Sequence, residues 1–166
     1  MKGKTISCRP KTWLLTALLT SASPFTWACS YDGLFTNPFA ESFPGALDVA
    51  IATQEAIQSN QIKMPKRLTG TPGLQRASWW LNLMVKNHPN LPANTYIYLV
   101  DTQLWSKYDE NKKLTVHANP PENDANIVLV SETALYNITN HNLKLDKAMQ
   151  LGMVTQTNNA TLLSKN

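Results

Sequence analysis

The chain has 166 residues, of which 43% are hydrophobic, with 15 lysines and arginines against 11 acids. The basic excess lies at the N-terminus, where Lys2, Lys4, Arg9 and Lys11 precede Cys29 without any acid. Without these four, residues 29–166 carry 11 basic and 11 acidic side chains and no net charge. The positive net charge of the whole chain is therefore no argument for nucleic acid or for an anionic membrane as a partner.

Residues 1–28 have the order of a secretory signal peptide. A basic start is followed by the short apolar run of residues 13–22, by Pro24, and by Thr26 and Ala28 three and one before a cut. The apolar run is shorter than the roughly 20 residues that span a bilayer. We expect cleavage before Cys29 and export to the bacterial periplasm. The alternative is a buried or membrane-anchoring N-terminal helix.

The two cysteines fit the same interpretation. Cys8 would leave with the signal peptide, so Cys29 would be alone and could form no intramolecular disulfide. Cys29 would also be the first residue of the mature chain, so a lipoprotein anchored at Cys29 is an alternative. Trp27 fits that alternative poorly, because lipoproteins usually have a small residue two positions before the cysteine.

Residues 29–44 predict an irregular segment, because Gly33 and Pro38 interrupt its aromatic residues. Phe35, Phe39 and Phe43 recur every four residues. They are either aromatic plugs packed on the domain or an arm that docks on a protein partner. The rest of the chain, residues 45–166, has the size of a single domain.

Two helices are expected first. In residues 45–59 the spacing predicts a helix with one face inward. That face comprises Ala46, Leu47, Ala50, Ile51, Gln54 and Ile57. After a loop at 61–73, residues 74–87 predict a second helix that Pro89 ends. Its apolar stripe comprises Leu74, Ala77, Trp80, Leu81 and Met84. Trp79 and Trp80 point about 100° apart, so one should be core and the other should lie at a rim or in a pocket.

From Thr95 the period changes to that of strands. Strands are predicted at 95–100, 103–108, 112–118, 126–130 and 153–157, with a hairpin turn at 109–111. Between the last two strands we expect two short helices. Ser131 caps the helix at 132–139, and Gly152 ends the helix at 145–151. The prediction is an α+β fold in which N-terminal helices precede a mostly antiparallel sheet with two short helices.

The second half resembles a sterol-carrier-protein domain over residues 95–157, and most clearly over 120–157. The similarity lies in an Asp-led strand, a capped small helix, a last helix and its closing turn. The residues concerned are Asp124, Ile127–Val130, Ser131-Glu132, Leu145-Asp146-Lys147-Ala148 and Gly152-Met153-Val154. Where the family usually has a glycine after the small helix, this chain has Asn140-His141-Asn142. The family's further C-terminal helix has no counterpart after Asn159.

The resemblance implies a fold that binds a lipid-like molecule between its sheet and its helices without catalysis. Burial of the ligand's apolar part would drive binding by about 0.8 kcal/mol per methylene. The candidate lining residues are Trp80, Leu83, Met84, Trp105, Leu135, Ile138, Met149 and Met153. Each of them could instead be plain core. The alternative function is an exported interaction or accessory subunit of an envelope complex. It would bind a protein partner through the N-terminal aromatic segment and the Trp79-Trp80 pair.

No catalytic or cofactor motif is recognised. His88, His117 and His141 lack the spacing of a metal site, and residues 70–73 match no phosphate-binding loop. Asp101 ends an apolar strand and Asp32 lies in a turn, where acids commonly hydrogen-bond the backbone. The sequence therefore predicts no enzyme, no cofactor and no metal. A hydrolase would require Asp32, Asp101 and a histidine to meet in one cleft.

Overall fold

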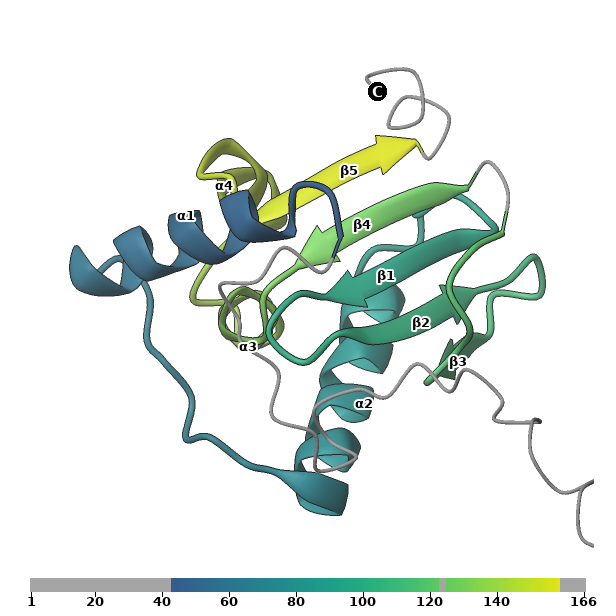
Figure 1. Ribbon diagram of the computed structural model, residues 1–166, viewed down its shortest axis with the longest axis horizontal. Coiled ribbons are helices and arrows are strands. Elements are labelled where there is room, and N and C mark those ends of the chain that lie inside the picture. The colour runs from purple at the N-terminus through teal and green to yellow at the C-terminus, as the bar shows by residue number, and fades with distance from the viewer. Residues whose placement is uncertain (1–42, 123–124, 159–166) are drawn as a thin grey trace, which may run out of the picture.

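The computed structural model describes residues 43–122 and 125–158 (Figure 1). Helices and strands follow one another in the predicted order. In chain order they are α1 (Ala46–Gln58), α2 (Gly70–Asn87), β1 (Thr95–Leu99), β2 (Leu104–Tyr108), β3 (Leu114–Val116), β4 (Asn126–Val130), α3 (Glu132–Thr139), α4 (Leu145–Gln150) and β5 (Val154–Asn158). The predicted signal peptide, Cys29 and all but the last two residues of segment 29–44 lie outside the described residues.

The sheet is mixed, which corrects the expectation of a mostly antiparallel sheet. Its strand order is β3-β2-β1-β4-β5. The hairpin strands and the outer pair β4–β5 are antiparallel, but the central pair β1–β4 is parallel, with Ile97 opposite Val128. Strand β4 follows β3 in the chain but pairs with the free side of β1. Local periodicity does not encode which strand it joins or in which direction, so the parallel pair was not predicted.

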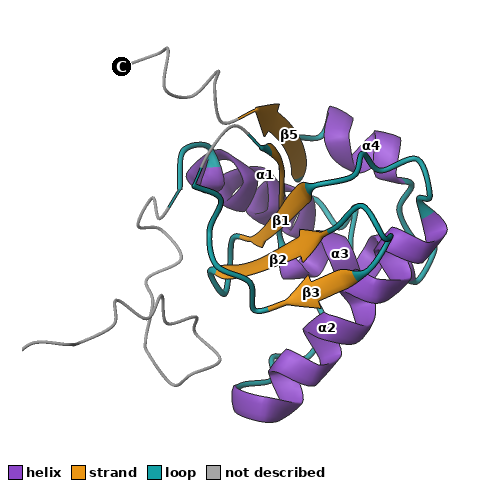
Figure 2. Cartoon of the chain, turned by 90° about the vertical axis from the view of Figure 1, so that its right-hand side faces the viewer, coloured by secondary structure: helices purple, strands orange, loops and turns teal. Residues whose placement is uncertain are grey.

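Helices α2, α3 and α4 lie on one side of the sheet (Figures 1 and 2), and the two faces of the sheet bury different side chains. One face, the helical face, carries Ile97, Leu99, Leu104, Val128 and Val130 against α2, α3 and α4. The opposite face, the aromatic face, carries Tyr98, Trp105, Ile127 and Leu129 and meets the start of α1 through Ala46 and Val49. The alternation follows directly from the two-residue period of a strand.

The inward face of α1 differs from the expected one. Its buried residues are Ala46, Val49, Ala50, Thr53 and Ala56, whereas Ile51 is 45% exposed, Gln54 is exposed, and Leu47 and Ile57 are only partly buried. Thr53 can lie inside because its hydroxyl donates to Val49 O and approaches Ser131 Oγ at 2.8 Å. The alanines let α1 pack closely, so small residues and not the larger aliphatic ones face the core.

Helix α2 begins at Gly70, four residues before the predicted start, and its expected apolar stripe is confirmed. Ala77, Trp80, Leu81 and Met84 are buried and Leu74 is partly buried. Pro72 lies in the first turn, where its missing N–H costs no helical hydrogen bond. The glycines and the proline of this stretch therefore do not exclude a helix, although they favoured a loop in the sequence.

Ser131 caps α3 as expected, since its Oγ accepts a hydrogen bond from Ala134 N at 3.0 Å. Helix α4 ends with Leu151 as its cap, and Gly152 follows with a φ of 75°. Gly152 N donates to Met149 O and Met153 N donates to Ala148 O, which is a Schellman ending. At the end of α3 the left-handed position is taken by His141, with a φ of 58°.

The remaining bounds are close to the expected ones. Strand β3 is shorter than residues 112–118, because Lys112 is a turn residue with a φ of 59° and His117 leaves the strand with a φ of 63°. Strand β5 begins at Val154 and not at Met153. No helix within the described ranges is long and apolar enough to cross a membrane.

Candidate functional site

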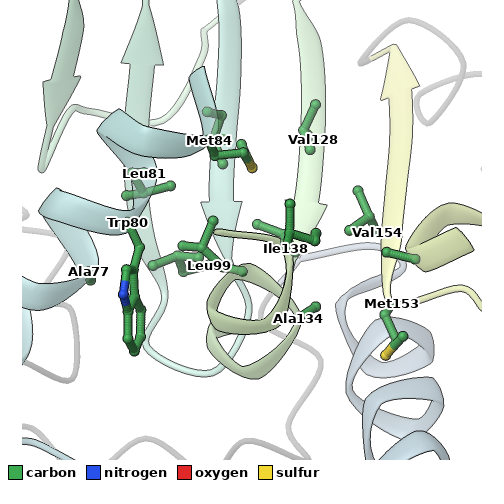
Figure 3. Packing of buried hydrophobic residues seen from close by; sticks show 14 of the residues in the cluster. Ala77, Trp80, Leu81, Met84, Leu99, Val128, Ala134, Ile138, Met153 and Val154 are labelled. Atoms are coloured by element: carbon green, nitrogen blue, oxygen red, sulfur yellow. The ribbon is translucent and has the colours of Figure 1, made fainter. Parts of the chain in front are cut away.

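The structure brings together most, but not all, of the eight predicted lining residues, and Figure 3 labels Trp80, Met84, Ile138 and Met153 among them. Five are buried in the core on the helical face, namely Trp80, Met84, Leu135, Ile138 and Met153. Leu83 is partly buried on α2. Met149 is 42% exposed on α4. Trp105 is buried on the aromatic face, so the sheet separates it from the other seven.

A small apolar cavity of about 50 Å³ lies on the helical face between α2, α4, β4 and β5. Its lining consists of Met84, Val85, His88, Leu91, Val128, Leu145, Met149, Val154 and Gln156. Met84 and Met149 are the two predicted residues that border it. His88 is half-buried at this cavity. The other buried candidates lie among the packed side chains of the core.

Trp80 is a core residue that also contacts the aromatic ring of Tyr136 and the charged side chain of Arg76. It is 4% exposed, and its ring lies 5.2 Å from that of Tyr136. The Arg76 guanidinium lies 4.6 Å above the Trp80 ring and bonds Glu132 Oε1 at 2.8 Å. Trp80 therefore holds α2 against α3. Trp79, by contrast, is 59% exposed on the outer side of α2.

The aromatic face carries a cluster of rings and an open groove that sequence reasoning did not find. Phe43 meets Trp105 edge to face at 5.2 Å, and Tyr98 lies 4.5 Å from Trp105. Beside them, a groove of about 510 Å³ is bordered by Tyr96 and Lys107 and by residues 118–122 of the β3–β4 connection. The alternation of β2 alone could have placed Trp105 and Lys107 on one face, because they are two residues apart.

Asp101 lies where the parallel strands β1 and β4 end. Its carboxylate accepts a hydrogen bond from the backbone N–H of Glu132, the first residue of α3. Burial raises the pKa of Asp101 to about 6, against the lowering effect of that hydrogen bond and of the nearby Arg67. This is the backbone-bonding role expected of a strand-end acid.

The described contacts of Asp101 link it to the start of α3. The Glu132 side chain pairs with Arg76, which also donates to Lys66 O. Ser131 is bonded to Thr53 and accepts from Ala134 N. His117 and His141 are exposed and His88 borders the apolar cavity. Asp32 lies outside the described residues. Within residues 43–122 and 125–158, no group of three or more His, Cys, Asp or Glu side chains could hold a metal ion.

Comparisons with protein-family models, with curated proteins and with solved structures found no match to this chain. Function is therefore argued from the chain's own residues and their arrangement.

Proposed function

We propose that this chain is an exported, non-catalytic domain that binds a lipid or another apolar molecule in the cell envelope. The observation that supports the proposal is the apolar cavity between α2 and α4, which is bordered by two methionines. Methionine is unbranched and flexible, so a wall built from it can adapt to a guest. The cavity lies between the sheet and the helices, where the sequence resemblance to sterol-carrier domains places a ligand.

The cavity must widen to accept a lipid. At about 50 Å³ it is far below the roughly 300–1,000 Å³ of ordinary small-molecule sites. Helix α4 is the element suited to move, because it has only six residues and only Ala148 among them is buried. Displacement of Leu145 and Met149 would open the cavity toward solvent. An acyl segment of about six methylenes would then gain roughly 5 kcal/mol from burial.

The test is the binding of a fluorescent fatty acid to the purified protein and to two tryptophan variants of α4. Leu145→Trp places a large side chain over the cavity, and we expect at least a tenfold weaker affinity. Lys147→Trp is the matched control, because Lys147 is exposed on the same helix and does not border the cavity. Equal affinities of the two variants would refute the site.

Native and denatured masses of the protein from a periplasmic extract of its own host provide an independent test. A discrete, extractable lipid mass would support the proposal and identify the ligand class. The mature mass would also show whether the chain begins at an unmodified Cys29. A bare protein mass that persists after incubation with lipid mixtures would contradict the proposal.

The alternative function is an interaction subunit, and the exposure of Trp79 favours it. A tryptophan that is 59% exposed on a helix is the kind of residue that anchors protein interfaces. Trp79→Glu should then abolish a complex seen in the native masses of a host extract. Asn82→Glu is its control, since Asn82 is also exposed on α2. A complex that survives Trp79→Glu would refute this docking surface.

A further inference from the structure

Lys107 differs from every other lysine that the structure describes. It is half-buried, whereas the other lysines in residues 43–122 and 125–158 are all exposed. Strand pairing places it directly opposite Tyr96, and its Nζ lies 5.5 Å from the centre of the Tyr96 ring. The one ion pair found among the described residues joins Arg76 to Glu132, so Lys107 has no acidic counterpart there.

The groove above Lys107 has the size of a small-molecule site. Its volume of about 510 Å³ lies within the roughly 300–1,000 Å³ of such sites. Tyr96 and Lys107 border it from the sheet, and residues 118–122 border it from the β3–β4 connection. That connection contains Pro120 and Pro121, whose rings fix φ and stiffen the wall. The groove is thus shaped before a ligand arrives.

The charges of the groove favour an anion. The Lys107 side chain is half-buried, and its Nζ is held over the Tyr96 ring, which provides a cation–π contact but no charge-neutralising partner. A carboxylate beside Lys107 would form a charge-assisted hydrogen bond in surroundings less polar than water. Glu122 also borders the groove, but it is exposed, so solvent and salt screen its charge.

We propose that this groove is a second binding site, specific for a small organic carboxylate with an apolar or aromatic body. Lys107 would bind the carboxylate, while Tyr96, Pro121 and Ala125 would contact the body. The groove lies on the aromatic face and the apolar cavity lies on the helical face. The sheet separates the two, so this site is independent of the proposed lipid site.

The test uses the purified protein, with benzoate as the probe and benzyl alcohol as its neutral isostere. Benzoate should shift the backbone amide NMR signals of Tyr96, Lys107 and Asn119 in a saturable way, and benzyl alcohol should bind at least tenfold more weakly. Lys107→Met keeps the apolar stem and removes the charge, so it should weaken benzoate binding at least tenfold. Lys107→Arg should retain the binding, which separates loss of charge from loss of fold.

Lys113→Met is the matched control, because Lys113 is an exposed lysine that does not border the groove. It should leave the benzoate affinity unchanged. Benzoate affinity that is equal in Lys107→Met and the unsubstituted protein would overturn the proposal. So would the absence of saturable shifts at the groove, or stronger binding there of inorganic phosphate than of benzoate. The lipid proposal depends on the effect of Leu145→Trp on the helical face, and the groove proposal on the effect of Lys107→Met on the aromatic face, so the two proposals fail separately.

Discussion

Asp101 provides the sharpest test of the physical reasoning, through the dependence of stability on pH. Burial raises the pKa of Asp101 from 3.8 to about 6, even though Glu132 N–H donates to its carboxylate. The folded state therefore holds this proton more tightly than the unfolded state. The stability that follows from it is fully present below about pH 4 and is lost as the pH rises through about 6.

The magnitude follows from the difference of about two pKa units. At roughly 1.4 kcal/mol per unit, the ionised carboxylate costs the fold about 3 kcal/mol as an upper limit. Asp101→Asn removes the charge and keeps an oxygen that can accept from Glu132 N–H. We therefore expect the variant to be more stable than the unsubstituted protein at neutral pH, by 3 kcal/mol at most, and nearly equal to it at about pH 4.

Urea unfolding, followed by tryptophan fluorescence from about pH 4 to 7.5, measures this difference. Asp146→Asn is the control, because Asp146 is exposed on α4 and its replacement should produce no comparable trend. A difference between Asp101→Asn and the unsubstituted protein that does not change with pH would refute the argument. Lower stability of the variant at neutral pH would also refute it, since it would mean that the charge stabilises the fold.

Two further substitutions test how the helices are held. Asn137 is fully buried and bonds Lys63 N, Lys63 O and Thr133 O, so Asn137→Ala should lower the free energy of unfolding by about 2–4 kcal/mol in urea unfolding. Amide exchange at Lys63 should also become faster, and unchanged exchange there would contradict the tether. Trp80→Ala should cost about 3–5 kcal/mol by calorimetry or urea unfolding, because Trp80 fills the interface of α2 and α3. A loss below about 1 kcal/mol would mean that Trp80 is no core residue.

These magnitudes bear on how the lipid proposal can be tested. Loss of ligand binding in Trp80→Ala could not be separated from damage to the fold, although the sequence made Trp80 an attractive site residue. Leu145 on α4 is the better position, because it borders the cavity and is only partly buried. The burial of a candidate residue therefore decides whether its substitution can test ligand binding without disrupting the fold.

The elements of this fold were largely predictable from local sequence. The stripe of α2, the hairpin of β2 and β3, and the capping of α3 by Ser131 all follow from patterns within a few residues. Such patterns report on one element at a time. They could not show that β4 returns parallel to β1, or that Thr53 of α1 is buried because Ser131 supplies a partner 78 positions along the chain.

The candidate sites were less predictable, because the hydrophobicity of a residue predicts that it is buried but not on which face of the sheet. Trp105 and Leu104 are both buried, yet they are neighbours on β2 and must point to opposite faces of a sheet that is covered on both. A set of lining residues chosen for apolar character therefore mixed two faces. The polar residues of a strand help to distinguish its two faces. Lys107 shares its face with Trp105, and its half-buried side chain borders the groove. The proposed second site rests on Lys107, which departs from the usual exposure of a lysine, whereas the apolar residues of the core conform to theirs.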